Sequence, residues 1–445
     1  MRSLIPLAGC VTALVIAGGG SAGAATPVAT VLVSVSSSGQ QGNHDSFAAG
    51  ISAHGRYVVF SSWATNLVPG DTNGRLDVFR HDRTTGATIR VSVSSRGIQA
   101  RCSDPWGCSG PASMSADGRE VAFVSSAANL VAGDTNHVSD VFVHDCVTGK
   151  TTRVSVGPAG RQANGASGSA AISADGRYVA FASSASNLVA HDTNGTSDVF
   201  VYDRVSHRTR RVSVGSAGIE GNRDSEEPAI SAHGRFVAFT SDASNLVAGD
   251  TNRIADVFVH DRDTGRTTRV SVSSGGAQAA GFPTGTGSNS PAISADGRYV
   301  AFHSEAQNLV RHDTNATFDI FVRDRRSGTT LRVNVSSNGS QANAETLGSP
   351  VISPDGRLVA FTSLATNLVP GDANGITDSF VHDRVTGTTI LASVSSSGVQ
   401  GNDSSAPAAF SADDSLLAFS SYASNLVPGD QNATVDAFLR VIGPW

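Results

Sequence analysis

The sequence predicts an all-β protein, a seven-bladed β-propeller of four-stranded antiparallel blades, and two observations carry this prediction. The chain shows no helical periodicity after residue 25, and it has short segments in which apolar and polar residues alternate, as in β-strands. It also repeats a motif, Ser-x-[Asp/His]-Gly-Arg followed by an apolar run, every 58 to 63 residues, with its serine at Ser52, Ser115, Ser173, Ser231, Ser294 and Ser353 and in degenerate form at Ser411. One blade cannot bury both of its faces, so seven consecutive units predict a ring of stacked blades.

Residues 228–274 show the order of the four strands that we expect in each unit. "PAIS" and "RFVAFTS" form the first two strands around a tight turn, and "ADVFVHDR" and "TTRVSVSS" form the third and fourth after a long polar loop. The second and third strands carry one phenylalanine each in every unit. We expect these rings to pack between blades and to supply much of the stability: Phe60, Phe79, Phe123, Phe142, Phe181, Phe200, Phe239, Phe258, Phe302, Phe321, Phe361, Phe380, Phe419 and Phe438.

The last unit stops after its third strand, "VDAFLRVIG", and a matching fourth strand is found at the other end of the chain. Residues 31–43, "VLVSVSSSGQQGN", have the fourth-strand pattern of the other units. We therefore expect the N-terminal strand to complete the seventh blade, which closes the ring and leaves no open edge.

Residues 1–25 have the layout of a secretory signal peptide that is removed, which leaves residues 26–445 as a single propeller domain. Arg2 precedes an apolar run, and the small residues Ala22-Gly23-Ala24 follow it. A lipid anchor at Cys10 is the alternative, but most of the apolar run lies after that cysteine. No later run approaches the ~18 apolar residues that span a bilayer. We expect a secreted protein, extracellular or periplasmic, without a transmembrane segment.

The charge pattern argues against nucleic acid as a partner. The net charge is -6, Lys150 is the only lysine, and the arginines are scattered, so no basic stripe would neutralise phosphates. We expect a monomer.

Export permits a disulfide between Cys102 and Cys108, which are close in sequence. Cys146 then remains a free thiol, and no activating base for it is recognisable nearby.

Two polar motifs repeat in the loops after the second and fourth strands, which leave a meander blade on the same face. We call this the loop-rich face, and the opposite face, which carries only tight turns, the turn face. One motif is Gly-x-Gln-[Ala/Gly]-Asn. The other is Asp-x-Asn-x-x-x-Asp, with the residues Asp71, Asn73, Asp77, Asp134, Asn136, Asp140, Asp192, Asn194, Asp198, Asp250, Asn252, Asp256, Asp313, Asn315, Asp319, Asp372, Asn374, Asp378, Asp430, Asn432 and Asp436.

These Asp-x-Asn loops allow two interpretations. Calcium takes six to eight oxygen ligands, and three side chains from one loop with a carbonyl and waters could supply them. Alternatively, Asp-x-Asn forms a hydrogen-bonded turn, and the second aspartate caps backbone N–H groups at the start of the third strand. Because the motif occurs in every unit, an architectural role is favoured over catalysis. Calcium is thus a possible cofactor, and no other cofactor is expected.

The repeated "S-x-D-G-R-x-V-A-F-x-S... D-V-F-V-x-D-R... R-V-S-V" resembles the TolB-like β-propeller repeat of the wider WD-type group. The resemblance covers nearly all of residues 26–445 and implies the propeller fold. Relatives of this repeat serve as periplasmic binding scaffolds, as gating domains of prolyl-oligopeptidase-type peptidases and as parts of glycan-active enzymes, so the resemblance leaves function open. We expect neither the extra N-terminal domain of TolB nor a hydrolase domain in residues 26–445.

Departures from the repeat are where a specific function is expected. The units with the longest loops before the first strand place Trp106 between the two cysteines and Phe282 in "AAGFPTGTGSNSP", and exposed aromatics suit recognition of a glycan or peptide. The fourth unit adds an acidic patch that could meet a cationic partner, formed by Glu220, Asp224, Glu226 and Glu227.

Two classes of function follow from these departures. The first is a secreted, non-catalytic propeller that binds a protein, peptide or cell-wall glycan through its loop-rich face. The alternative is an extracellular glycan- or peptide-active enzyme with a site at the mouth of the central channel, for which the unrepeated His303 and Glu305 are the first catalytic candidates.

Overall fold

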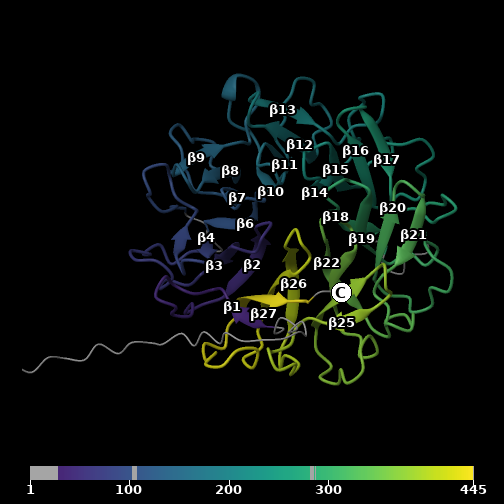
Figure 1. Cartoon of the computed structure of the whole chain (residues 1–445). Coiled ribbons are helices and arrows are strands. Elements are labelled where there is room, and N and C mark those ends of the chain that lie inside the picture. Colours follow the sequence, from purple (N-terminus) through teal and green to yellow (C-terminus); the bar gives the residue numbers. More distant parts are fainter. Residues whose placement is uncertain (1–28, 103–107, 281–284, 286, 444–445) are drawn as a thin grey trace, which may run out of the picture.

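The computed structural model describes residues 29–102, 108–280, 285 and 287–443, and these form seven four-stranded antiparallel sheets arranged in a ring (Figure 1). The only helical element in these ranges is a short 3-10 turn, η1 (Pro158–Gly160). The predicted all-β, seven-bladed propeller is confirmed. None of the helices in the described part of the chain is long and apolar enough to cross a membrane. The predicted signal peptide lies outside the described residues.

Each blade is a meander whose strands run from the ring centre outward. The first strands, which lie nearest to the ring axis (Figure 1), are β2 (Ser46–Ile51), β6 (Ser109–Met114), β10 (Ser167–Ile172), β14 (Ser225–Ile230), β18 (Ser288–Ile293), β22 (Thr346–Ile352) and β26 (Ser405–Phe410). The second strands are β3 (Tyr57–Ser62), β7 (Glu120–Ser125), β11 (Tyr178–Ser183), β15 (Phe236–Ser241), β19 (Tyr299–Ser304), β23 (Leu358–Ser363) and β27 (Leu416–Ser421).

The third and fourth strands form the outer half of each blade. The third strands are β4 (Asp77–Asp82), β8 (Asp140–Asp145), β12 (Asp198–Asp203), β16 (Asp256–Asp261), β20 (Asp319–Asp324), β24 (Asp378–Asp383) and β28 (Asp436–Val441). The fourth strands of blades 1 to 6 are β5 (Thr88–Arg90), β9 (Lys150–Arg153), β13 (Arg208–Arg211), β17 (Arg266–Arg269), β21 (Thr329–Arg332) and β25 (Thr389–Leu391).

The fourth strand of blade 7 comes from the start of the chain, as predicted. β1 (Thr30–Leu32) pairs antiparallel with β28, with Val31 opposite Leu439. Beyond the strand, Val33 and Ser34 are fully buried, and the Ser34 hydroxyl donates a 2.6 Å hydrogen bond to Asp436. The two ends of the chain therefore close the ring through one sheet.

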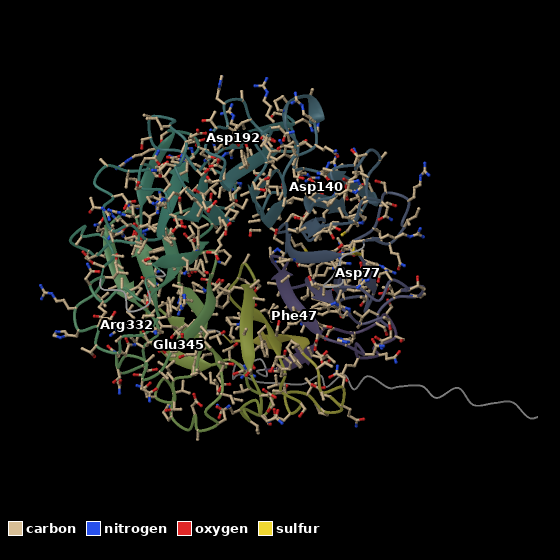
Figure 2. The ribbon with its side chains drawn as sticks, turned by 180° about the vertical axis from the view of Figure 1, so that it is seen from behind. Phe47, Asp77, Asp140, Asp192, Arg332 and Glu345 are labelled. Atoms are coloured by element: carbon tan, nitrogen blue, oxygen red, sulfur yellow. A yellow bond between two sulfur atoms is a disulfide. The ribbon has the colours of Figure 1, made fainter. Side chains whose placement is uncertain are left out.

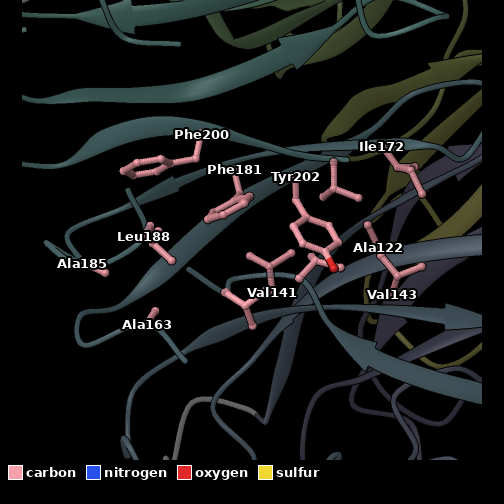
Figure 3. Close-up of a cluster of buried hydrophobic side chains, with 13 residues drawn as sticks. Ala122, Val141, Val143, Ala163, Ile172, Phe181, Ala185, Leu188, Phe200 and Tyr202 are labelled. Atoms are coloured by element: carbon pink, nitrogen blue, oxygen red, sulfur yellow. The ribbon is translucent and has the colours of Figure 1, made fainter. Parts of the chain in front are cut away.

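The core lies between blades, and the repeated phenylalanines form its centre. Each second-strand ring stacks on the third-strand ring opposite it, with centroids 5.4–5.9 Å apart, and every one of the fourteen is fully buried. Figure 3 shows one such layer, in which Phe181 and Phe200 of blade 3 belong to the same cluster as Val141 and Val143 of blade 2. Burial of each ring contributes about 2 to 3 kcal/mol, and the predicted packing role is confirmed.

On the turn face, backbone hydrogen bonds link the first turn of one blade to that of the next. Ala53 N–H donates to the Ala116 carbonyl, and similar bonds follow around the ring up to that from Ala295 N–H to the Pro354 carbonyl, with Asp175 N–H as the donor in blade 3. The next bond, from blade 6 to blade 7, would need an N–H at residue 354, which proline lacks. At this junction Asp414, which stands where most other blades have glycine, bonds to Asp355 through its side chain. Burial, together with this carboxyl–carboxyl contact, raises the pKa of Asp414 to about 7.

Asp414→Asn is expected to stabilise the protein at pH 8 and to leave its stability at pH 4 unchanged. The folded protein holds the Asp414 proton more tightly than the unfolded chain, so stability falls as the pH rises from about 4 to about 7. The asparagine keeps the hydrogen bond without the charge and tolerates the left-handed backbone (φ 58°). The gain is on the order of 1 kcal/mol because the side chain is partly exposed to solvent. Melting temperatures measured from pH 4 to 8 test this, and a variant whose curve runs parallel to that of the wild type would contradict it.

Candidate functional site

The Asp-x-Asn loops lie at the loop-rich end of the third strands, where an arginine lies between the two aspartates. In blade 1 the Arg90 Nη1 atom lies 3.2 Å from the Asp71 carboxylate and 3.1 Å from that of Asp77. Asp77 also accepts hydrogen bonds from the Ser92 hydroxyl and from the Asn73 amide, and it is fully buried. The sequence motif therefore supplies the two acids and the amide, and the fourth strand supplies the cation.

The same arrangement recurs in blades 1 to 5, and we call it the arginine–aspartate belt. The Nη1 atoms of the belt arginines lie 2.9–3.3 Å from both carboxylates of their blade, and these arginines are Arg90, Arg153, Arg211, Arg269 and Arg332. Figure 2 shows Asp77, Asp140, Asp192 and Arg332 at successive positions around the ring. Burial raises the pKa of the blade 4 carboxyls, Asp250 and Asp256, although Arg269 opposes that shift.

Blades 6 and 7 have leucine in place of the belt arginine, at Leu391 and Leu32. There the glutamine of the second repeated motif takes over. Gln400 Nε2 lies 2.8 Å from both Asp372 and Asp378, and Gln41 Nε2 makes the same contacts to the aspartate pair of blade 7 at 2.8 and 2.7 Å. In blade 1 the corresponding amide points the other way, because the Gln99 oxygen accepts from Arg90 and its nitrogen donates to Thr72.

The Asn73 side-chain oxygen accepts from the Arg75 backbone N–H, as expected of an Asx-type turn. The predicted capping role of the second aspartate is not seen in blade 1: Asp77 accepts from the side chains of Ser92, Asn73 and Arg90, and the Val78 backbone N–H donates to the Ser92 hydroxyl. In the described part of the chain, no three histidine, cysteine, aspartate or glutamate side chains converge as a group that could hold a metal ion. Calcium binding by the loops stays a prediction. Glu220, which the sequence groups with the acidic patch, instead occupies the glutamine position of blade 3 and pairs with Arg211 at 2.7 Å.

The mouth of the central channel on the loop-rich face is lined by positions that vary between blades. The first strands of neighbouring blades contact one another around the channel, so their first residues surround this mouth. The residue that follows the second strand lies beside them. Its type changes around the ring from blade 1 to blade 7: Trp63, Ser126, Ser184, Asp242, Glu305, Leu364 and Tyr422. We call this region the channel mouth.

One side of the channel mouth, at blades 6, 7 and 1, is aromatic. Phe47, 36% exposed, and Tyr422, 50% exposed, line a cavity of about 350 Å3 together with Leu347 and Pro407. Trp63 meets the Phe47 ring edge-on, with the centroids 5.8 Å apart. Exposed aromatic rings next to serine and threonine hydroxyls suit both apolar and carbohydrate ligands.

The other side, at blades 4 and 5, is acidic. Glu226 and Glu227 are exposed on β14, the innermost strand of blade 4. Burial raises the pKa of Glu226, and the neighbouring carboxylates of Asp224, Glu227 and Asp242 raise it further. Glu227 accepts hydrogen bonds from the Ser290 backbone N–H (2.8 Å) and from the Thr240 hydroxyl (2.9 Å), so it joins blades 4 and 5. The structure therefore brings three residues of the predicted acidic patch together at the channel mouth, with Asp242 as a fourth carboxylate.

Trp106 and Phe282, the predicted ligand-binding aromatic residues, lie outside the described residues, and their role stays a prediction.

The predicted disulfide between Cys102 and Cys108 is present, with the two Cα atoms 5.4 Å apart. Because Cys108 immediately precedes β6, the disulfide itself lies next to the channel mouth. Burial raises the pKa of the free thiol of Cys146 to about 11, which keeps it protonated and unreactive at neutral pH.

The catalytic candidates His303 and Glu305 are both buried, with 9% and 2% of their surface exposed. His303 Nε2 lies 2.9 Å from the Thr346 carbonyl, Nδ1 lies 3.3 Å from the Asn289 amide oxygen, and the imidazole stacks on Phe318. Burial lowers the pKa of His303 although Glu345 and Glu227 oppose the shift. Through its contact with the Thr346 carbonyl of β22, His303 of β19 joins blades 5 and 6.

The sequence reasoning missed Phe47, Trp63 and Tyr422. All three lie at regular repeat positions, whereas the sequence features that indicate function by their length are the inserted loops. A register of the seven units would have shown that the residue after the second strand is small in blades 2 and 3, acidic in blades 4 and 5, and large in blades 6, 7 and 1.

No protein-family model matches the chain, and no curated protein sequence matches it. Among solved structures, it is similar to an oligogalacturonate lyase in complex with manganese, with 12% identity, a TM-score of 0.53 and coverage of 95% of this chain and 98% of that chain. It is similar to the β-propeller domain of the trilobed protease from Pyrococcus furiosus, with 11% identity, a TM-score of 0.52 and coverage of 88% and 93%.

A third similar structure is TolB from Acinetobacter baumannii, with 16% identity and a TM-score of 0.40 over 71% of this chain. The match spans 59% of that TolB chain, less than two thirds of its length. At these identities, the likenesses to the lyase and to the protease domain show the fold alone. Membership of the TolB-like repeat family stays a prediction.

Proposed function

We propose that the chain is a secreted, non-catalytic propeller that binds a protein, peptide or cell-wall glycan at the channel mouth. The observation that carries this proposal is the division of the channel mouth into an aromatic side (Phe47, Trp63 and Tyr422) and an acidic side (Glu226 and Glu227). A ligand that spans both sides would combine an apolar or sugar surface with a positive charge, as in a peptide with lysine or arginine or a glycan with free amino groups. The buried state of His303 supports binding over catalysis.

The rest of the loop-rich face explains why the channel mouth is the preferred site. The belt aspartates are buried and already bonded to arginine or glutamine, so they offer a ligand little. The carboxylates at the channel mouth, in contrast, lie close enough to repel one another, and a cationic ligand would relieve that repulsion. Trp106 and Phe282, carried by the loops before β6 and β18, are proposed to extend the binding surface.

The double variant Phe47→Ala/Tyr422→Ala is expected to weaken ligand capture by about 10- to 100-fold, because aromatic anchors carry much of the energy of such interfaces. Glu226→Gln is expected to weaken cationic ligands by about 5-fold and to leave neutral ones unaffected. Ligands are first found on peptide and glycan arrays with the chain from residue 26 onward, and affinities are then measured by calorimetry.

Val385→Ala is the matched control, because Val385 is 77% exposed on the turn face. Each ligand is also assayed for turnover, since an oligogalacturonate lyase is among the similar structures. Turnover abolished by His303→Gln would replace the binding proposal by the enzymatic alternative. Unchanged affinities in the aromatic and acidic variants would place the ligand elsewhere.

A further inference from the structure

A large cavity lies on the turn face, on the side opposite the channel mouth. It has a volume of about 650 Å3 and lies between blades 3 and 4, next to the first turn of blade 5. Four arginines line it: Arg208 and Arg210 on β13, Arg235 at the first turn of blade 4, and Arg262 after β16. We call it the arginine cavity.

Three of these four guanidinium groups have no carboxylate partner in the described structure. Arg235 is bonded to Asp261 at 2.9 and 3.0 Å, but Arg208, Arg210 and Arg262 form no ion pair. Of the carboxylates that line the cavity, Asp203 is paired with Arg177 and Asp263 lies 3.3 Å from Arg235, which leaves Asp296. The lining therefore has one more arginine than aspartate, in a protein whose net charge is -6.

Arg262 is held in a fixed position at the cavity wall. Its guanidinium donates to the Gly234 carbonyl and lies over the Tyr178 ring, 4.2 Å from the centroid. Burial lowers the pKa of Arg262, and the positive charge of Arg210 lowers it further, while Tyr178 and the Asp203 carboxylate oppose the shift. Arg210 and Arg262 therefore repel one another, and Asp203 offsets part of this repulsion. An anion placed between them would relieve this repulsion, and a preorganised donor loses little entropy on binding it.

The arrangement is specific to blade 3. Arg210 is opposite Val201, and the equivalent positions of the other blades are uncharged: Ile89, Thr152, Thr268, Leu331, Ile390 and Val31. In blade 2 the residue equivalent to Tyr178 is Glu120, which pairs at 2.8 Å with Arg204, the counterpart of Arg262. The neighbouring groove thus neutralises its arginine internally, whereas the arginine cavity does not.

The aromatic walls of the cavity offer no free stacking surface. Tyr178 has Arg177 at 4.7 Å and Arg262 at 4.2 Å from its centroid, and Phe236 has Arg235 at 4.7 Å and Arg325 at 4.5 Å. Recognition in the cavity therefore rests on charge and hydrogen bonding rather than on ring stacking. Guanidinium groups bind carboxylate and phosphate oxygens through paired N–H donors.

We propose that the arginine cavity binds a compact anion with two or more carboxylate or phosphate groups, and that Arg208, Arg210 and Arg262 recognise it. This site is independent of the channel mouth, because it lies on the other face of the ring and carries the opposite charge.

Calorimetric titration of the chain from residue 26 onward with citrate and with tripolyphosphate tests the proposal, with acetate as the monovalent control. At least one of the two multivalent anions is expected to bind about 10-fold or more tightly than acetate, with an affinity that falls as salt is added. Binding of citrate alone would identify polycarboxylates, and binding of tripolyphosphate alone would identify polyphosphates.

Arg210→Thr, which gives blade 3 the residue of blades 2 and 4, is expected to weaken that binding about 10-fold, since one charge-assisted contact is lost. Arg266→Thr, at the Arg208 position of blade 4, is the matched control and should have no effect. Both arginines are exposed, so neither variant threatens the fold. Failure of both multivalent anions to bind more tightly than acetate, or equal affinity in Arg210→Thr and the wild type, would overturn the proposal.

Discussion

A chain that begins at Gly39 is expected to melt at a far lower temperature than one that begins at Ala29. The truncation removes β1, and with it the backbone pairing to β28, the buried side chain of Val33 and the Ser34 hydrogen bond to Asp436. Loss of these contacts costs at least about 5 kcal/mol. The new edge at β28 also exposes unpaired backbone groups of blade 7, which favours aggregation.

Thermal and urea unfolding, followed by circular dichroism, measure this effect. Because the two ends of the chain close the ring, the truncation should also broaden the transition, with blade 7 and its neighbours unfolding first. The chain that begins at Ala29 is the control and should match the one that begins at residue 26. Equal melting temperatures for all three chains would show that closure through β1 contributes nothing to stability.

The number of blades, the strand order and the closure could all be predicted because they are local properties of the repeat. Each unit carries its own alternation of apolar and polar residues and its own turn residues. The strand at residues 31–37 belongs to no complete unit, and only the last unit lacks a fourth strand with which it could be completed. The belt could be predicted only in part. The motif of Asp250, Asn252 and Asp256 is contiguous, but Arg269 lies one strand further along the chain, and distance in sequence does not reveal that its guanidinium reaches both acids.

The sequence nevertheless contains a signal for the belt that internal comparison could have found. Only two blades have leucine at the belt position, and the same two lack threonine at the x position of Asp-x-Asn. Blade 6 has Leu391 with Ala373, and blade 7 has Leu32 with Gln431. In blade 1 the corresponding Thr72 binds the glutamine amide that faces the arginine. Two positions that change together in the same blades indicate a shared contact.

The aromatic side of the channel mouth was harder to predict because it joins opposite ends of the chain. Phe47 and Tyr422 are 375 residues apart in the sequence and become neighbours only through ring closure. Single residues at regular repeat positions also lack the length signal that marked the loops around Trp106 and Phe282. Their assembly follows from the closed topology rather than from any local pattern.

Arg269→Leu is expected to destabilise the protein by about 3 to 5 kcal/mol, although leucine occupies the same position in blades 6 and 7. The substitution leaves the carboxylates of Asp250 and Asp256 buried without the guanidinium that lies 3.1 Å from each, and an uncompensated buried charge carries a cost of this size. Gln278 cannot replace the arginine at once, because its Nε2 donates to Thr251 at 2.8 Å.

The double variant Arg269→Leu/Thr251→Ala recreates the residues of blade 6 and is expected to recover about 1 to 2 kcal/mol of that loss. Without the threonine hydroxyl, the Gln278 amide is free to rotate and to donate to both aspartates, as Gln400 does. Thr251→Ala alone is the control and should be mildly destabilising. It removes the hydrogen bond from Gln278, while Arg269 still occupies the position between the two aspartates to which the Gln278 amide would otherwise donate.

The pH dependence of the same variants separates a charge effect from a packing effect. Without Arg269, the folded-state pKa of Asp250 and Asp256 rises further above that of the unfolded chain, so stability is lost as the pH increases above the ordinary aspartate pKa of about 4. The difference in stability from the wild type should therefore grow as the pH rises, whereas a cavity left by the shorter side chain would give a constant difference.

Melting the Arg269→Leu variant with calcium and with a chelator tests the calcium prediction where it is strongest, because the two carboxylates and Asn252 then have no cation of their own. A calcium-dependent rise in melting temperature in this variant, absent from the wild type, would show that arginine and calcium are alternative occupants of the same position.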